Sequence, residues 1–339
     1  MKTLQFVEIG KPLQLAEVAI PSASSGGLVF KVKACGICGS DLHAVEVPGL
    51  LHPGSTLGHE YSGEVVEVGS GCEGWQIGDR LTAVPARPCG ACPECRAGLY
   101  GQCSQIIAQG FDPRMPGAFA EYSTCMAGLA VKISDALSDD EAATIEPMAV
   151  GLNAWKAAKI DPGAGVLILG AGVIGLAVAK WAHFFGAGDI AISEIVPARR
   201  ARAEAIGFDL IIDATQQTDP VAEFERRTGR KPAAIFECVG RPIIDKMIAM
   251  APSHTQLVMV GTGMQPDSFT VISAAMKRLR MTFPFAYVAA DFHFTQRMMN
   301  SRRITVDHLI TDTVSLDEAS EMFALLGKPN DHCKVLIKP

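Results

Sequence analysis

The stretch Val166-Leu167-Ile168-Leu169-Gly170-Ala171-Gly172-Val173-Ile174-Gly175 decides the fold of this 339-residue chain. Its four apolar residues predict a buried strand, and the glycines that follow predict a tight turn into a helix over about 173–187. Gly170 permits the turn, Gly172 lets the backbone approach a pyrophosphate, and Gly175 lets the helix pack against the strand. The stretch therefore predicts a dinucleotide site at a helix N-terminus, and the alternative is a glycine-rich turn without a ligand.

The sequence after this turn keeps alternating between strand and helix. Strands are expected at 190–193, 210–212, 234–236 and 257–260, with helices at about 197–206, 219–229 and 242–250. Apolar strands joined by helices predict a parallel sheet covered on both faces. Glu194 ends the second strand, where a carboxylate can bind an adenosine ribose and repel a 2′-phosphate. This favours NAD over NADP, although Arg199 and Arg200 could accommodate a phosphate.

The first 150 residues follow a different pattern. Short apolar runs such as Gly27–Val32 and Gly63–Gly69 lie between turns rich in glycine, proline and serine, which predicts a mainly-β domain. The net charge of −6 gives no reason to expect nucleic acid or an anionic membrane as partner. No secretory signal is visible, and the longest uncharged apolar run, 163–179, is short for a bilayer span. We therefore expect a soluble, cytoplasmic protein.

Four of the ten cysteines form the strongest local motif. Cys89, Cys92, Cys95 and Cys103 lie within 15 residues, separated by glycine and proline turns. Four thiolates at this spacing can surround one tetrahedral metal ion and leave no open position, which is typical of a structural zinc site. Free thiols, or disulfides in an oxidising compartment, are the alternative.

A second group of metal-ligand types is dispersed along the β-rich part. Cys38 is followed by Asp41 and His43, then by the pair His59-Glu60, and Glu146 comes at the expected junction with the nucleotide domain. Cysteine, histidine and carboxylate all bind zinc, and three protein ligands with one open position are the catalytic pattern. A buried structural cysteine or a surface histidine is the commoner explanation for any single member. The neighbouring nucleotide fold strengthens the zinc interpretation, because hydride loss from an alcohol calls for a Lewis acid.

Taken together, the motifs resemble the zinc-dependent medium-chain alcohol dehydrogenases, and within them the sorbitol, butanediol and threonine dehydrogenase branch. The resemblance covers essentially the whole chain. Its carriers are CGICGSDLH at 35–43, GHE at 58–60, GDR at 78–80, the four cysteines, GAFAEY at 117–122, IEP at 145–147, GAGVIG at 170–175 and ECVG at 237–240. Gly39 stands where liver-type members carry an arginine, which fits the polyol branch and removes one cofactor contact.

The resemblance implies a split GroES-like catalytic domain, residues 1–148 and 288–339, around a Rossmann domain at 149–287. Cys38 and His59 would bind the catalytic zinc, and Glu60 would either ligate it or stand behind it. Glu146 matches the third-ligand position, where a carboxylate binds directly or through water. Asp41 would orient the histidine, and Cys35 would be a packing residue. The predicted cofactor contacts are Gly170, Gly172, Val173, Ile174, Gly175, Glu194, Arg199, Cys238 and Gly261.

The implied reaction is reversible hydride transfer from a secondary alcohol or polyol to NAD, giving a ketone, with one catalytic and one structural zinc per chain. Ser40 would take the hydroxyl proton and pass it through the cofactor ribose to His43, while the plainer interpretation is a turn hydroxyl and a surface imidazole. Two rivals are a zinc-independent enone or quinone reductase and a non-catalytic nucleotide-binding protein. A homodimer or homotetramer is expected, and Phe119, Phe285 and Tyr287 are candidates for the pocket wall.

Overall fold

The computed structural model describes residues Met1–Pro339, and its internal contacts divide the chain into two units. The first unit comprises Met1–Glu146, Val288–Val306 and Ile310–Pro339, and the second comprises Pro147–Tyr287 with Asp307–Leu309. The predicted division placed 147–148 and 307–309 in the first group, whereas these five residues lie in the second unit. None of the helices is both long and apolar enough to cross a membrane.

The second unit is a doubly wound parallel sheet, as predicted from Val166–Gly175. Its strands are β10 (Val166–Leu169), β11 (Ile190–Glu194), β12 (Leu210–Asp213), β13 (Ala234–Glu237), β14 (Gln256–Met259) and β15 (Arg280–Thr282). They lie in the order β12-β11-β10-β13-β14-β15, and every neighbouring pair is parallel. The strand order reverses between β10 and β13, and ligands of such sheets bind at this point.

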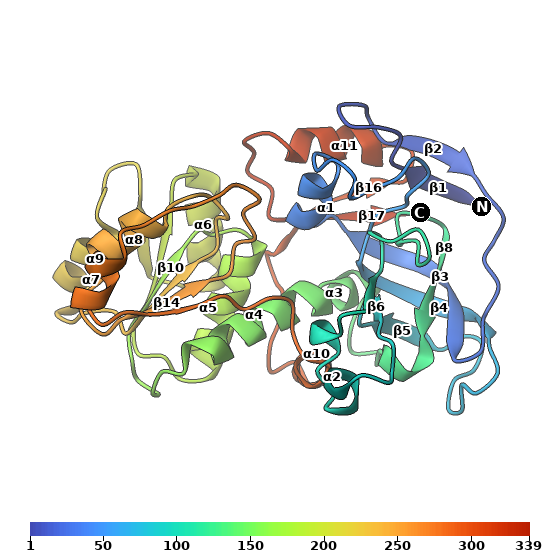
Figure 1. Ribbon diagram of the computed structural model, residues 1–339, viewed down its shortest axis with the longest axis horizontal. Coiled ribbons are helices and arrows are strands. Elements are labelled where there is room, and N and C mark those ends of the chain that lie inside the picture. The colour runs from blue at the N-terminus through green and yellow to red at the C-terminus, as the bar shows by residue number, and fades with distance from the viewer. The chain divides into compact units, whose positions relative to one another are not determined.

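Helices connect these strands. They are α4 (Ile145–Ala158), which begins in the first unit, α5 (Val173–Phe184), α6 (Pro197–Ile206), α7 (Pro220–Thr228), α8 (Ile244–Met250) and α9 (Val271–Met276). Figure 1 shows several of them around β10 and β14. All four residues of β10 are buried, because helices cover both faces of a parallel sheet. The predicted helices at 173–187, 197–206, 219–229 and 242–250 are all present, with ends that differ by no more than three residues.

The first unit is built on a mostly antiparallel sheet. Its order is β16-β17-β3-β4-β5-β9, and β8 also pairs with β3. These strands are β3 (Gly27–Gly36), β4 (Glu60–Val68), β5 (Arg80–Ala83), β8 (Tyr122–Met126), β9 (Ala130–Lys132), β16 (Ile310–Ser315) and β17 (Lys334–Lys338). The C-terminal strand β17 pairs with β3 through Leu336 and Gly36, so the last residues of the chain complete the sheet that the first forty begin.

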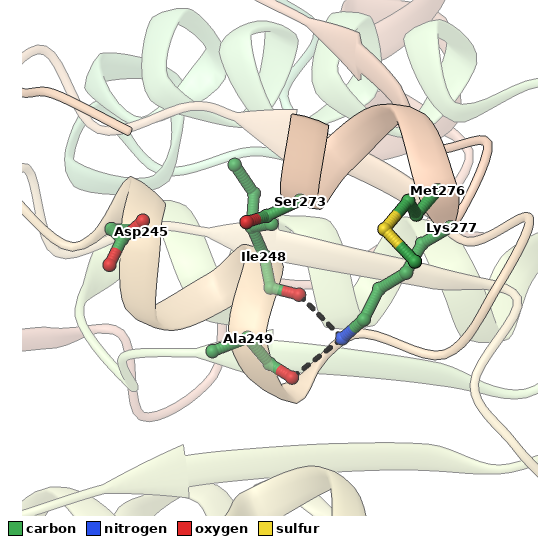
Figure 2. A pocket seen from close by; sticks show the side chains of 6 residues that line it. All are labelled: Asp245, Ile248, Ala249, Ser273, Met276 and Lys277. Carbon is green, nitrogen blue, oxygen red and sulfur yellow. Dashed lines mark hydrogen bonds between the residues drawn. The ribbon is translucent and has the colours of Figure 1, made fainter. Parts of the chain in front are cut away.

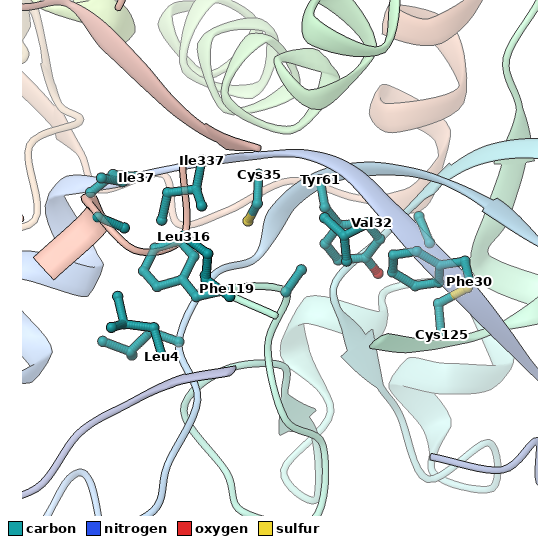
Figure 3. Close-up of a cluster of buried hydrophobic side chains, with 14 of the residues drawn as sticks. Leu4, Phe30, Val32, Cys35, Ile37, Tyr61, Phe119, Cys125, Leu316 and Ile337 are labelled. Atoms are coloured by element: carbon teal, nitrogen blue, oxygen red, sulfur yellow. The ribbon is translucent and has the colours of Figure 1, made fainter. Parts of the chain in front are cut away.

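Smaller elements complete this unit. They are β1 (Lys2–Gln5), β2 (Gln14–Glu17), α1 (Gly39–Ala44), β6 (Ala86–Arg87), α2 (Pro93–Arg96), η1 (Tyr100–Gln102), β7 (Ile107–Ala108), η2 (Ala127–Leu129), α3 (Asp139–Ala143), α10 (Ala289–Asn300) and α11 (Ala319–Leu326). Figure 3 shows part of the core, in which Phe30 and Tyr61 stack with ring centroids 4.9 Å apart. Phe119 is fully buried in this cluster, so its predicted place on a pocket wall is wrong.

Candidate active site

The pairing of β3 with β4 brings the first two predicted zinc ligands together. Gly36 near the end of β3 lies opposite Glu60 at the start of β4, so the residues just beyond them meet at one edge of the sheet. Cys38 is the N-cap of α1, and His59 immediately precedes β4. One ligand atom each from Cys38, His59 and Glu60 lies within 4.8 Å of the others. Strand register thus brings together two residues that are 21 positions apart in the sequence.

Asp41 fixes the orientation of both ligands. It is fully buried, and its Oδ2 accepts a hydrogen bond from the Cys38 backbone N–H at 3.0 Å. Its Oδ1 lies 3.3 Å from His59 Nδ1. Burial lowers the pKa of His59, but the charge of Asp41 and contacts with Asp41 and Cys38 outweigh burial and raise the pKa well above its usual value. The surroundings of the imidazole therefore favour a positive charge.

Glu60 forms a buried ion pair with Lys334, which begins β17. Both side chains are 1% exposed, and Lys334 Nζ donates to Glu60 Oε2 and to the Ile37 carbonyl, the latter at 2.8 Å. Burial lowers the pKa of Lys334, but the negative charge of Glu60, with smaller contributions from Cys38 and Asp41, outweighs burial and raises the pKa, which favours the ammonium form. The second carboxylate oxygen, Oε1, is buried and has no hydrogen-bond partner. A buried, unpaired anionic oxygen is costly unless a cation is near.

These observations fit a zinc ion. A thiolate, an imidazole nitrogen and a carboxylate converge, one buried oxygen lacks a partner, and the surrounding charges favour a cation. Because Asp41 faces Nδ1, the nitrogen of His59 available to the metal is Nε2. Glu146 lies buried in the first turn of α4 and is not one of the three residues of this group.

The two predicted proton-relay residues lie on α1. Ser40 Oγ is 3.4 Å from His59 Nε2, so its hydroxyl is next to the predicted zinc ligand. His43 is in the last turn of the helix and is exposed to solvent. The two residues lie on the same helix, and no contact between Ser40 and His43 is seen.

The four cysteines of the predicted structural site also converge. Their Sγ atoms all lie within 4.8 Å of one another. Cys92 is the N-cap of α2 and accepts a hydrogen bond from the Cys95 N–H, and the Cys89 N–H approaches Cys103 Sγ at 3.5 Å. Backbone N–H groups of Ala91 and Cys92 lower the pKa of Cys89 to about 6, whereas burial and neighbouring thiols raise the pKa of Cys95. The lowered pKa favours the thiolate form of Cys89, which is the form that binds a metal.

The glycine turn has the geometry predicted for a pyrophosphate site. Gly170 has φ +99°, a left-handed conformation that other residues rarely adopt. A Cβ at Gly175 would lie 1.9 Å from the Gly170 carbonyl oxygen, so only glycine allows this close packing. A Cβ at Gly172 would meet no protein atom within 4 Å. The space beside Gly172 is consistent with a ligand, and Val173 and Ile174 open α5 directly after it.

Glu194 plays a structural part that the sequence analysis did not anticipate. Its Oε2 accepts a hydrogen bond from the Ala171 N–H at 2.8 Å, and Oε1 accepts from Ile195 and Val196. The carboxylate therefore holds the glycine turn as well as standing at the predicted ribose position. Arg200 donates to the Glu194 and Ile195 carbonyls and pairs with Asp213, so its guanidinium is engaged within the protein. Arg199 lies in the first turn of α6.

The other predicted cofactor residues lie at the same edge of the sheet. The Cys238 N–H donates to the Leu169 carbonyl, which places Cys238 beside the glycine turn. Gly261 follows β14, and its N–H donates to the Glu237 carbonyl. Sequence reasoning missed Glu237, a 1% exposed carboxylate that accepts hydrogen bonds from Val239 and Gly240. An acidic residue at the end of a buried strand was the signal that could have found it.

Two residues that contact the metal group were also missed. Phe111, in the loop after β7, lies against His59 with ring centroids 5.3 Å apart. Lys334 contacts Glu60 across 274 positions of sequence, and no local pattern marks either contact. Of the remaining aromatic candidates, Tyr287 is buried and Phe285 is exposed. An open pocket of about 460 Å³ between α8 and α9 contains none of the predicted site residues (Figure 2).

The fold and the metal group define a two-unit dehydrogenase with a zinc-type site and a nucleotide-binding sheet. Residues 24–135 match the alcohol dehydrogenase GroES-like domain, and residues 173–300 match the zinc-binding dehydrogenase domain. The chain is 31% identical to (R,R)-butanediol dehydrogenase of Bacillus subtilis, over 97% of each chain. It is 30% identical to sorbitol dehydrogenase of the same organism, over 97% of this chain and 95% of that protein.

A solved structure supports the same family assignment. The crystal structure of 2R,3R-butanediol dehydrogenase from Bacillus subtilis superposes with a TM-score of 0.89, at 30% identity, over 100% of this chain and 99% of that one. The chain belongs to the zinc-dependent alcohol dehydrogenase family. Its reaction class is therefore hydride transfer between an alcohol and a nicotinamide dinucleotide, which favours the dehydrogenase over the zinc-independent reductase and over a non-catalytic protein.

Proposed function

We propose that this enzyme oxidises a secondary alcohol or polyol to the ketone, with NAD as hydride acceptor. The observation that carries the proposal is the convergence of Cys38, His59 and Glu60 on a chain that also holds the Gly170–Gly175 turn. The relatives named for sorbitol and butanediol support a substrate whose hydroxyl is on a secondary carbon. The proposed domains are residues 1–148 with 288–339 for catalysis and 149–287 for the nucleotide.

The proposed chemistry divides between the metal, the cofactor and the protein. When bound, zinc supplies a Lewis acid that lowers the pKa of a substrate hydroxyl. Ser40 would accept the hydroxyl proton and pass it through the cofactor ribose towards His43, which is exposed to solvent. Bound NAD would supply the acceptor for the hydride from the same carbon, so that the alcohol and NAD would give one ketone, one reduced cofactor and one proton. Asp41 holds His59, and Glu60 and Glu146 are the carboxylates available to the metal.

NAD is the proposed cofactor because Glu194 places a negative charge at the end of β11. A 2′-phosphate there would meet a carboxylate that three backbone N–H groups already hold in position. Arg200, one of the two arginines able to offset that charge, is paired with Asp213. The proposed nucleotide contacts are Gly170, Gly172, Val173, Ile174, Gly175, Glu194, Arg199, Cys238 and Gly261.

We propose two zinc ions per chain, one catalytic and one held by Cys89, Cys92, Cys95 and Cys103. Metal analysis of the purified protein tests this count. Two equivalents support it, and Cys95→Ser is then expected to retain one equivalent and to unfold at a lower temperature. A single equivalent that Cys95→Ser leaves unchanged would contradict the structural site. Thiolate ligands need a reducing compartment, which supports a cytoplasmic location.

We also propose a homodimer or homotetramer, formed through the apolar surface between Met264 and Phe285. Met276 is 78% exposed and Phe285 is 76% exposed, and Val271, Ile272 and Phe283 are also well exposed. β15 is one of the two edge strands of its sheet, and it lies in the same stretch. A second copy that pairs with this edge would cover both features.

Lys277 lines the pocket shown in Figure 2. Its ammonium group donates hydrogen bonds to the Ile248, Ala249 and Ala251 carbonyls at the end of α8.

Light scattering tests the assembly. Phe285→Glu is expected to lower the molar mass towards that of one chain, because a charge would be buried in the contact. Ile77→Glu is the matched control, since Ile77 is 70% exposed in the first unit and outside this surface. A wild-type mass of one chain would contradict the proposal.

A panel of alcohols with NAD and NADP, followed by the absorbance of the reduced nicotinamide, tests the reaction. We expect turnover with vicinal diols or polyols, little with primary alcohols, and a higher kcat/KM with NAD. Turnover only with enones, or none after zinc has been restored, would contradict the proposed function.

A further inference from the structure

Lys334 is a buried cation beside the metal group, and it comes from the opposite end of the chain. It opens β17, which pairs with β3 beside Gly36, and this pairing brings its side chain to the start of β4. Its Nζ donates to the Ile37 carbonyl and to Glu60 Oε2. Ile37 precedes Cys38 and Glu60 follows His59, so one ammonium group holds the backbone beside one ligand and the carboxylate beside the other.

The backbone is shaped to admit this pair. A Cβ at Gly36 would lie 2.1 Å from Glu60 Oε2 and 3.1 Å from Lys334 Cδ. Only glycine therefore leaves room for the carboxylate where Lys334 holds it. Burying two charges costs several kcal/mol per ion before their attraction is counted, so a buried ion pair is a poor device for stability alone. Its position next to Cys38 and His59 suggests a role towards the metal.

The carboxylate of Glu60 is attracted in two directions, towards the ammonium group of Lys334 and towards a cation at the metal site. Oε2 is bound to Lys334, whereas Oε1 is buried without a partner beside two metal-ligand types. A carboxylate free of Lys334 would be drawn fully to a divalent cation and would occupy the coordination position that substrate needs, since catalytic zinc requires an open position. The ammonium competes with the cation for the same negative charge.

We propose that Lys334 is a positioning residue that restrains Glu60 and so keeps one position on the catalytic metal open for substrate. The inference rests on the proposed zinc site and deepens it. In this proposal Lys334 holds the Glu60 carboxylate beside the metal. The strand β17, which begins at Lys334, is then part of the metal site. Lys334 acts through Glu60 and does not touch the substrate.

Cobalt-substituted enzyme tests this with a readout other than activity. Cobalt(II) replaces the catalytic zinc, and imidazole is added as a probe of the open position while the visible absorption spectrum is recorded. The wild type is expected to change its spectrum on adding imidazole, and Lys334→Met is expected to respond at least tenfold more weakly. Lys334→Met should also release zinc to a chromophoric chelator at least tenfold more slowly. Lys334→Arg, which keeps the charge, is expected to retain the response.

A double variant guards against misfolding. Lys334→Met leaves Glu60 buried without its partner, whereas Lys334→Met with Glu60→Gln removes both charges. The double variant is expected to recover the imidazole response, because an amide is a weaker metal ligand than a carboxylate. Faster zinc loss in Lys334→Met, an unchanged imidazole response there, or a double variant that stays unresponsive would each overturn the inference. Failure of the proposed function is distinct, since the wild type itself would then bind no metal at Cys38.

Discussion

Asp41 joins the two ligand candidates Cys38 and His59 through the two oxygens of one carboxylate. Oδ2 accepts the Cys38 N–H at 3.0 Å, and Oδ1 lies 3.3 Å from His59 Nδ1. Oδ1 is also 3.4 Å from the Gly58 nitrogen, so the loop before β4 is held by the same group. One buried side chain thus orients a thiol and an imidazole that lie on different elements.

Asp41→Asn is expected to weaken zinc retention at the catalytic site by about tenfold or more, because outer partners of a metal-bound histidine typically contribute 10–100-fold to affinity. The amide keeps the shape of the side chain but loses the charge that fixes the imidazole. The measurement is the rate of zinc transfer to a chromophoric chelator. A folded Asp41→Asn protein that holds zinc as firmly as the wild type would show that Asp41 only caps α1.

Cys38→Ser is expected to abolish turnover while NADH still binds, since the cysteine belongs to the metal group and the glycine turn is elsewhere in the chain. NADH fluorescence titration and a turnover assay measure the two effects. Cys35→Ala is the control, because Cys35 is a fully buried core residue next to Phe119. It should lower thermal stability and retain zinc. Activity that survives in Cys38→Ser would remove the metal from the reaction.

The nucleotide fold could be predicted from sequence because its signals are local. Val166–Gly175 encodes a strand, a turn and a helix within ten residues, and the predicted strands agree with β10–β14 to within one residue at each end. The fold class is confirmed. The stretch after residue 288 could not be placed from its pattern, since its mixed polarity has no period. The family resemblance implied only that this segment returns to the catalytic domain, and the pairing of β17 with β3 was not predicted.

The metal group was predicted as a list of ligand types, and the structure adds their partners. Cys38 and His59 lie just beyond two strands that pair with each other, β3 and β4. The motifs and the family resemblance were therefore enough to predict that both belong to one metal site. Lys334 could not be predicted, because a lysine before Val335-Leu336-Ile337 has the appearance of an ordinary strand end. Its role depends on a pairing across 274 residues. Glu194 was predicted to bind the cofactor ribose. Its hydrogen bond with the Ala171 N–H was not predicted, because it depends on a loop geometry that the local sequence pattern does not reveal.

Gly172→Ala and Gly175→Ala are expected to separate cofactor binding from folding. A Cβ at Gly172 meets no protein atom, so this variant should unfold at the wild-type temperature, yet its methyl group would occupy the approach of a pyrophosphate. A Kd for NADH at least tenfold higher is expected. Gly175→Ala would place Cβ 1.9 Å from the Gly170 carbonyl and should lower the unfolding temperature. Wild-type affinity for NADH in Gly172→Ala would mean that the turn is not the phosphate site.

Glu141 is expected to make the stability of the first unit sensitive to acid. Burial works to raise its pKa, but hydrogen bonds from Arg302 and Ser138 outweigh burial and lower the pKa below its usual value. Its Oε2 accepts from the Ser138 N–H at 2.9 Å, and its carboxylate pairs with Arg302, which follows α10. The same side chain therefore caps α3 and ties it to a segment from the C-terminal part of the chain.

The sign of the pH effect follows from the lowered pKa. In the unfolded chain the glutamate titrates near its ordinary value of about 4.3, so its stabilising contribution is complete above that pH and is lost as the pH falls through the lower, folded pKa. Arg302 is 46% exposed, and solvent screening limits the contribution to about 0.5–1 kcal/mol. Glu141→Gln should therefore unfold at a lower temperature than the wild type at pH 7, and the difference should shrink below about pH 4. Glu73→Gln, an exposed change of the same charge, is the control. A difference between Glu141→Gln and the wild type that stays constant from pH 7 to pH 3.5 would show that the capping geometry, and not the charge of Glu141, stabilises this region.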